Sequence, residues 1–225
     1  MAKRRKNSNS DDGLLLGEQA YLRLKDLLLT GALKAGEFVS TQDLVKLLDC
    51  PLAPTREAVK RAANESLLRV VPKRGMYVMD VTPELIRECF ELRALFDQEG
   101  ARLLASGPTP QWFDELRAAH VRVLEEARDE VTTDLQREAK DVDWRMHEML
   151  SGKLRNTLVS EIYERNRERI RIMQNSRPLL PDRIVPAMEE HLVILDAISG
   201  QRPDAAEQAV RDHCRQTLRW WGILT

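Results

Sequence analysis

The stretch Pro51-Leu-Ala-Pro-Thr-Arg-Glu-Ala-Val-Lys-Arg61 decides how the N-terminal third of this chain folds. Proline favours the first turn of a helix, so Pro54 predicts a helix that begins there and continues to about Ser66. An apolar stripe predicts another helix over residues 42–48. Only a short turn, residues 49–54, separates the two, and this spacing is typical of a helix-turn-helix.

The segments on either side of this pair complete a small domain. Residues 14–30 have the apolar periodicity of a helix, and a glycine-punctuated loop follows. Beyond the central pair, residues 67–71 and 76–79 are β-like runs joined by the basic turn Pro72-Lys-Arg-Gly75. Three helices followed by a two-stranded wing predict a winged helix-turn-helix, a DNA-binding fold, over residues 14–80.

Residues 81–225 show no further strand signal and predict an all-helical bundle. Glycines and prolines divide this part into helical stretches at 83–105, 110–129, 133–151, 156–175, 183–199 and 203–222. The predicted fold class is therefore mostly α, a winged helix-turn-helix followed by a helical bundle. The closing stretch Arg219–Thr225 is apolar, and we expect it to pack against the bundle or a partner subunit.

Composition and charge suit a globular protein with a head that binds nucleic acid. Apolar residues make up 43% of the chain and charged residues 32%, without an apolar run that could cross a membrane. Residues 1–80 carry a net charge of +4 and residues 81–225 one of −5, giving the −1 of the chain. Three cysteines at unrelated spacings indicate a reduced, cytoplasmic protein. Residues 1–13 predict a disordered basic tail, either solubilising or able to touch DNA.

Residues near the start of the third helix and at the wing tip are candidates for DNA contact. In a helix-turn-helix, the start of the recognition helix reaches base edges in the major groove. Arg56 stands there, while Lys60 and Arg61 suit phosphates, and the wing tip suits a flanking minor groove. The candidates are Thr55, Arg56, Lys60, Arg61, Lys73, Arg74 and Gly75. The alternative is a set of ordinary solvated charges, but their clustering favours DNA contact.

The N-terminal motifs resemble the winged helix of the GntR family of regulators. They are Gly31-x4-Gly36, Asp43-Leu44, Pro54-x-Arg56-Glu57-Ala58, Leu67 and Arg74-Gly75, in the family's order and spacing. Leu52 and Gln42 depart from the pattern, because the family usually or often has arginine there. The resemblance implies a homodimer that presents two recognition helices to double-stranded operator DNA. Because of the two departures, the operator sequence cannot be inferred from those of relatives.

One aspartate and three histidines are spaced for a metal site in the bundle. Asp143 and His147 lie at i and i+4 of one predicted helix, so their side chains share a face. His191 and His213 lie about nine and ten residues from the turn between the last two helices, level in an antiparallel pair. The set suits a divalent metal, unless the four are unrelated residues. His120 fits no such pattern.

The helical part resembles the FCD effector domain that often follows a GntR winged helix. The motifs are Glu91-Leu-Arg93-x3-Asp97-x3-Ala101, Asp143-x3-His147-x8-Asn156 and Glu190-His191-x3-Leu195-x-Ala197-Ile198 with His213. The resemblance implies an effector-binding and dimerisation domain over residues 81–225 that holds a divalent metal. Zinc is the preferred metal, and nickel, manganese and iron are the alternatives. Its implied ligands are Asp143, His147, His191 and His213. The metal would help hold a small organic acid or sugar acid, and Arg93 would form an ion pair with the carboxylate of that acid. The alternative is that Arg93 pairs with Asp97 on its own helix.

These features predict a DNA-binding transcriptional regulator, a repressor and not an enzyme, controlled by a small carboxylate metabolite. One alternative makes the metal ion itself the signal. Another is a metal-dependent hydrolase or lyase, since His147-Glu148 begins a zinc-protease motif. Ser151 stands where that motif requires a second histidine, which disfavours the enzyme. The run Arg165, Arg167, Arg169 and Arg171 is interpreted as a mostly solvated helix face.

Overall fold

The computed structural model describes residues 15–176 and 181–223 of the chain. Its internal contacts divide the chain into two compact units, residues 1–81 and residues 82–225. The first unit is a winged helix-turn-helix and the second an all-helical domain, so the predicted fold class is confirmed. The predicted basic tail, residues 1–13, lies outside the described residues.

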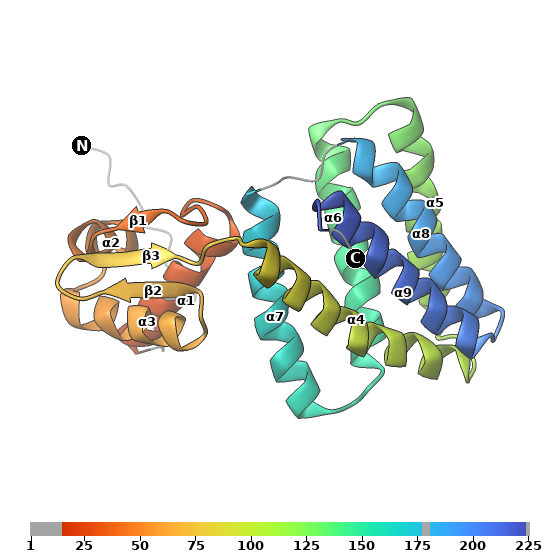
Figure 1. The fold of residues 1–225 in the computed structure, drawn as a ribbon, viewed down its shortest axis with the longest axis horizontal. Coiled ribbons are helices and arrows are strands. Elements are labelled where there is room, and N and C mark those ends of the chain that lie inside the picture. Colours follow the sequence, from red (N-terminus) through yellow and green to blue (C-terminus); the bar gives the residue numbers. More distant parts are fainter. Residues whose placement is uncertain (1–14, 177–180, 224–225) are drawn as a thin grey trace, which may run out of the picture. The chain divides into compact units, whose positions relative to one another are not determined.

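The first unit combines three helices with a small antiparallel sheet (Figure 1). Its elements are α1 (Leu16–Leu29), β1 (Phe38–Val39), α2 (Thr41–Leu48), α3 (Leu52–Asn64), β2 (Leu68–Val71) and β3 (Gly75–Val78). The strand order is β1-β3-β2, with Phe38 paired to Tyr77 and Val39 to Met76. The two predicted wing strands are confirmed as β2 and β3, whereas β1 was missed, because two residues are too few to show alternation.

The bounds of α2 and α3 follow from local chemistry. The Ser40 hydroxyl accepts a hydrogen bond from the backbone N–H of Asp43 at 3.1 Å, which starts α2. The helix ends where Asp49 adopts a left-handed conformation with a φ of 47°. α3 begins at Leu52, before the predicted start at Pro54. Proline is tolerated throughout the first turn of a helix, where the N–H groups lack helical partners, so its position marks the start only loosely.

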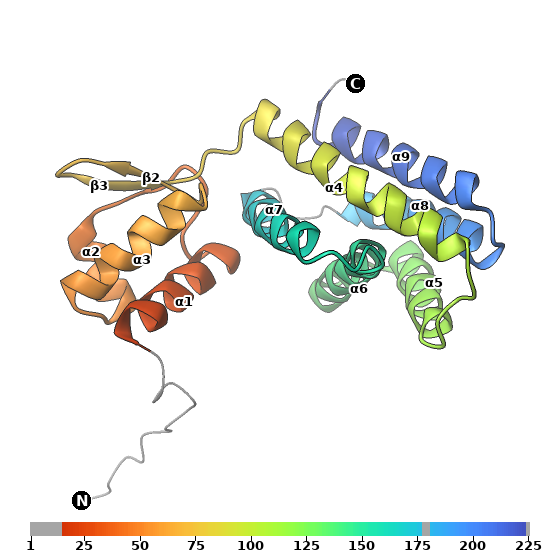
Figure 2. The ribbon, with the colours of Figure 1, turned by 90° about the horizontal axis from the view of Figure 1, so that it is seen from below.

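The second unit is a bundle of helices (Figures 1 and 2). They are α4 (Pro83–Ala105), α5 (Phe113–Asp129), α6 (Thr133–Gly152), α7 (Thr157–Ser176), α8 (Pro181–Ser199) and α9 (Pro203–Trp220). Threonine hydroxyls at positions 82 and 132 cap α4 and α6 by accepting backbone N–H groups. Among the residues described, no helix is long and apolar enough to cross a membrane.

Close helix packing aligns the elements that carry the candidate metal ligands. α9 packs against both α4 and α8, while α6 contacts α4, α5 and α8. A Cβ added at Gly100 on α4 would lie 1.9 Å from the carbonyl oxygen of Leu150 on α6, so only glycine fits there. The chain end packs as predicted as far as Ile223, since Trp221 and Ile223 are buried, with the Trp221 ring 6.1 Å from Phe90. Residues 224–225 lie outside the described part.

The arginine run on α7 is less solvated than predicted. Arg165 is exposed, whereas Arg167, Arg169 and Arg171 are half-buried. Arg167 forms an ion pair with Glu148 on α6 at 2.5 Å. Because successive residues are spread around a helix, alternate positions do not stay on one face, and part of this run turns toward α6.

Candidate functional site

A groove of about 810 Å³ lies between α3 and the β2–β3 turn of the winged unit. Arg56 and Lys60 line it from α3, and Lys73 and Arg74 from the turn. We call these four residues the basic groove. All four are exposed, and none has a carboxylate partner within the described residues. Four free cations beside a recognition helix suit contacts to phosphates and base edges.

Two other residues predicted to contact DNA point elsewhere. Thr55 is fully buried, and its hydroxyl donates to the carbonyl oxygen of Pro51 at 2.9 Å, so its side chain cannot reach DNA. Arg61 pairs with Glu18 on α1 at 2.6 Å and lies over the ring of Tyr21. The prediction was wrong for the Thr55 side chain, which faces the domain interior. Arg61 is exposed although it pairs with α1, so its phosphate contact stays a prediction.

Gly75, also predicted to contact DNA, lines the basic groove. It is buried, with a φ of 153°, and a Cβ there would lie 2.3 Å from the carbonyl oxygen of Val39. Only glycine therefore allows β3 to pass this close to β1. Its contribution is to shape the turn that carries Lys73 and Arg74.

The helices α6, α8 and α9 bring the four predicted metal ligands together inside the second unit. Ligand atoms of His147, His191 and His213 all lie within 4.8 Å of one another. Asp143 Oδ1 lies 3.4 Å from His191 Nε2 and 3.7 Å from His147 Nε2. All four side chains are buried. We call these four residues the histidine cluster.

Unpaired nitrogens give the histidine cluster its chemical character. Nε2 of His147, His191 and His213 is buried in each case, without a hydrogen-bond partner among the described residues. Buried polar atoms nearly always have a partner, so three such atoms in one place need an explanation. A divalent cation between them supplies one, because imidazole nitrogen and carboxylate oxygen are its usual ligands. The residues present therefore fit a metal ion.

His147 is held from outside the cluster by α4 and α7. Its Nδ1 lies 2.7 Å from Asp97 Oδ2. The Tyr163 hydroxyl lies 3.0 Å from the other oxygen of Asp97 and 3.1 Å from the His147 carbonyl. A carboxylate on Nδ1 fixes the proton there and leaves the lone pair on Nε2, facing the cluster.

His213 has an equivalent support. Its Nδ1 lies 2.7 Å from Glu190 Oε2. Arg183 donates to the two oxygens of Glu190 at 2.8 and 2.7 Å, and to the Thr217 hydroxyl at 3.2 Å. The Glu190 carboxylate is thereby fixed, and it directs the Nε2 lone pair of His213 into the cluster.

Burial sets the protonation of these groups. It lowers the pKa of His147 and His191 well below the ordinary value, which favours the neutral imidazole that binds metals. Burial also raises the pKa of Asp97 to about 7, against the opposing effects of Arg93 and the Tyr163 hydrogen bond. Burial acts to raise the pKa of Glu190 too, but its hydrogen bonds from His213 and Arg183 hold that pKa below the usual value.

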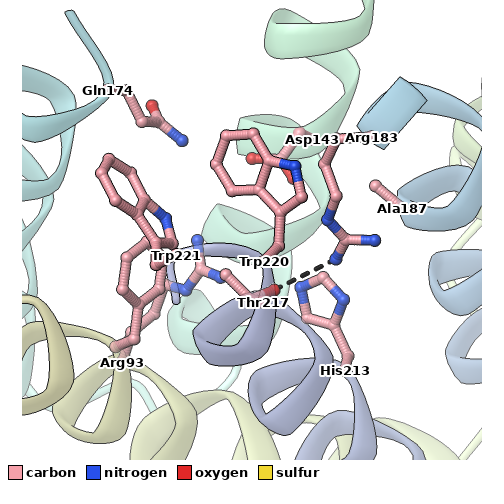
Figure 3. A pocket seen from close by; sticks show the side chains of 10 residues that line it. Arg93, Asp143, Gln174, Arg183, Ala187, His213, Thr217, Trp220 and Trp221 are labelled. Atoms are coloured by element: carbon pink, nitrogen blue, oxygen red, sulfur yellow. Dashed lines mark hydrogen bonds between the residues drawn. The ribbon is translucent and has the colours of Figure 1, made fainter. Parts of the chain in front are cut away.

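A small cavity adjoins the histidine cluster (Figure 3). It has about 30 Å³ of free space, room for roughly two waters. Its lining residues are Phe90, Arg93, Asp143, Gln174, Arg183, Ala187, His213, Thr217, Trp220 and Trp221. The Arg93 Nε lies 3.7 Å from Asp97 Oδ2, so the alternative pairing within α4 is present while the same guanidinium also lines the cavity.

Two models of known families match this chain. Residues 16–78 match the bacterial regulatory proteins of the gntR family, and residues 88–216, more than half of the chain, match the FCD domain. This chain belongs to the GntR family, with an FCD domain. The resemblance seen in the motifs is thereby confirmed, and the chain is a DNA-binding transcriptional regulator.

Curated relatives of this GntR-family chain are also regulators. It is 22% identical over 200 residues to an uncharacterized HTH-type transcriptional regulator, YdhC, of Bacillus subtilis, covering 87% of this chain and 86% of that one. It is 25% identical over 187 residues to the Nta operon transcriptional regulator of Aminobacter aminovorans, covering 81% and 83%. These relatives favour regulation over the hydrolase or lyase alternative.

Solved structures show the same fold. A putative GntR transcriptional regulator from Rhodococcus sp. RHA1 matches with a TM-score of 0.72 at 18% identity, covering 93% of this chain and 99% of the other. McbR/YncC of E. coli matches with a TM-score of 0.68 at 19% identity, covering 92% and 97%. The fold, a winged helix-turn-helix unit and an all-helical unit, is thus shared with these solved structures.

Sequence reasoning missed the residues that support the cluster. Asp97 and Glu190 stood within quoted motifs, but only as a partner of Arg93 and as a neighbour of His191. Tyr163 and Arg183 carried no signal. Tyr163 reaches Asp97 across helices that are distant in sequence, whereas Arg183 reaches Glu190 seven positions further along α8 and Thr217 on α9. An aromatic or cationic residue at helical spacing looks the same whether it packs or supports a site.

Proposed function

We propose that this GntR-family regulator is a homodimeric repressor whose affinity for operator DNA is set by a small organic acid. The acid would bind beside a divalent metal in the FCD domain, held by Asp143, His147, His191 and His213. When bound, the ion would offer an open coordination position to a carboxylate oxygen. The donor set favours zinc, with nickel, manganese or iron as the alternatives.

One observation carries this proposal. The three unpaired Nε2 atoms and the Asp143 carboxylate converge beside the cavity that Arg93 lines. Arg93 is almost fully buried, and its only carboxylate contact among the described residues is the long one to Asp97. Its guanidinium is thus free to pair with an acid held at the same place.

The size of the cavity implies movement on binding. A space of about 30 Å³ does not admit a sugar acid or a dicarboxylate. Trp220 and Trp221 line the cavity near the end of α9, and their displacement would open it (Figure 3). An acid that binds only the opened form shifts the equilibrium toward that form. We propose that this shift changes how the domain presents its winged unit to the operator.

The test measures operator affinity with and without acids. An operator is selected from a random DNA library, and fluorescence anisotropy is recorded for zinc-loaded protein with a panel of dicarboxylates and sugar acids. We expect one class of acid to weaken DNA binding by at least tenfold, a coupling of about 1.4 kcal/mol. Arg93→Met should abolish that response. Arg102→Met should keep it, because Arg102 lies on the same helix but does not line the cavity and pairs with Glu99.

The small cavity also supports a second candidate, in which the metal ion itself is the signal. A site with room for roughly two waters holds an ion and its remaining ligands without rearrangement. In that case zinc added to metal-free protein changes operator affinity, and no acid changes it further. If the acid response depends on metal but metal alone has no effect, the first function is supported.

A further inference from the structure

His120 on α5 is the fourth histidine, and it lies against the cluster although no motif includes it. It is fully buried, and its ring centroid is 5.3 Å from that of His191, with the rings nearly edge to face. Its Nδ1 lies 2.8 Å from the carbonyl oxygen of Leu116. A carbonyl oxygen only accepts, so the proton of neutral His120 is on Nδ1, and its Nε2 carries a lone pair.

His191 presents the complementary need. Its Nε2 faces Asp143 and the other cluster nitrogens. If Nε2 is to bind a metal, the ring proton must be on Nδ1, as it is for the other two histidines of the cluster. His147 has Asp97 for that proton, and His213 has Glu190. For the Nδ1 of His191, no hydrogen-bond partner occurs in the described parts of the chain.

The two unpaired atoms match each other. His120 Nε2 is a buried acceptor and His191 Nδ1 a buried donor, both lacking partners among residues 15–176 and 181–223. Two imidazoles joined by an N–H···N hydrogen bond have ring centroids about 5 Å apart, and the 5.3 Å between these two rings leaves room for such a bond if His191 turns toward His120. We infer that His120 is the positioning residue of His191: it accepts the Nδ1–H on its Nε2 and so directs the His191 Nε2 lone pair into the metal site.

This inference rests on the metal site of the proposed function, and it completes a pattern. Each of the three histidines then has one partner on its Nδ1. The partner is a carboxylate for His147 and His213, and for His191 it is the imidazole of His120, which is itself held by a backbone carbonyl. Unlike a carboxylate, His120 adds no negative charge to the site. The imidazole partner therefore fixes orientation without raising the electron density on His191 as strongly as Asp97 does for His147.

The test is a histidine proton spectrum of ¹⁵N-labelled, full-length protein loaded with zinc. We expect a His191 Nδ1–H signal that is shifted downfield and protected from solvent exchange. In His120→Phe, which keeps the ring volume, that signal should move or vanish, and the zinc Kd should rise about 10- to 100-fold. His120→Gln offers a carbonyl oxygen as acceptor, and it should recover most of the affinity and a protected signal.

A matched control separates positioning from packing. Leu124→Ala on the same helix removes a buried side chain and should lower the free energy of unfolding without changing the zinc Kd. An unchanged zinc Kd and an unchanged His191 signal in His120→Phe would overturn the inference while leaving the metal site standing. If the parent takes up no zinc, the proposed function fails instead. The His191 Nδ1–H of the metal-free protein then decides: a protected proton lost in His120→Phe supports the pairing, and an unprotected proton overturns it.

Discussion

The basic groove and the histidine cluster both contain polar atoms that have no protein partner among the described residues, yet this lack has a different meaning in the two places. Arg56, Lys60, Lys73 and Arg74 are exposed, so water satisfies them and their lack of partners costs little. The nitrogens of the cluster are buried, where an unpaired polar atom costs about 1–3 kcal/mol. An unpartnered group therefore points to a ligand far more strongly inside the bundle than on the winged surface.

The largest effect should come from the close packing of α4 against α6, which supports the histidine cluster and plays no part in the basic groove. Gly100→Ala puts a methyl group against the Leu150 carbonyl and should lower the free energy of unfolding of the FCD domain by about 3 kcal/mol. Urea unfolding followed by tryptophan fluorescence measures this, since all four tryptophans lie in residues 82–225. Gly152→Ala is the control, because a Cβ there has no described atom within 4 Å. Equal midpoints for the two variants would contradict the packing described.

The next effect separates the two faces of α3. Arg56→Ala should weaken operator binding by about 10- to 100-fold, because it removes a cation at the start of the recognition helix. Arg61→Ala should change operator affinity much less, since Arg61 pairs with Glu18 and covers Tyr21 on α1. Anisotropy titrations of both variants at one salt concentration give the comparison. A larger loss of operator affinity in Arg61→Ala than in Arg56→Ala would contradict this account, because DNA would then contact the face of α3 that carries Arg61.

A pH titration distinguishes the buried site from the exposed one. Burial raises the pKa of Asp97 to about 7, so below that pH its carboxyl is protonated and donates to His147, moving the ring proton to Nε2. Metal binding must then release this proton. Zinc affinity should rise about tenfold per pH unit up to about pH 7 and level off above it.

Asp97→Asn tests the assignment of that proton. The amide does not titrate, so the variant should bind zinc more weakly at neutral pH but with a flatter pH dependence below 7. Zinc Kd values measured from pH 5.5 to 8 by competition with a chelator show the slope. The same slope in both proteins would assign the proton to another group.

The smallest effect concerns a single phosphate contact. Lys60→Ala should reduce the slope of log K against log salt concentration by about 1, since one counterion fewer is released on binding. Operator affinities at four salt concentrations measure it. A slope that does not change would remove Lys60 from the contact surface.

How far the sequence predicts this molecule depends on the range of the interactions. The helix-turn-helix depends on caps and turns within a few residues. Its prediction fails at a short strand, Phe38–Val39, which gives no pattern, and at the start of α3, which proline marks only loosely. The Thr55 side chain was misplaced because spacing indicates a helix but not which of its faces meets DNA. The cluster ligands were predicted from position within an antiparallel pair and from family motifs. The supports were not predicted: Tyr163 reaches Asp97 from a helix that is distant in sequence, and the pairing of Arg183 with Glu190, two turns along α8, has the spacing of any residues on one helix face.

The central claim, that the histidine cluster holds a metal, is tested most directly by elemental analysis of purified protein. We expect about one divalent metal ion per chain in the parent and little in Asp143→Ala/His147→Ala. The control Asp141→Ala/Glu148→Ala removes two exposed carboxylates from the same helix and should keep the metal. A parent that is metal-free and takes up neither zinc, nickel nor manganese on incubation would contradict the claim.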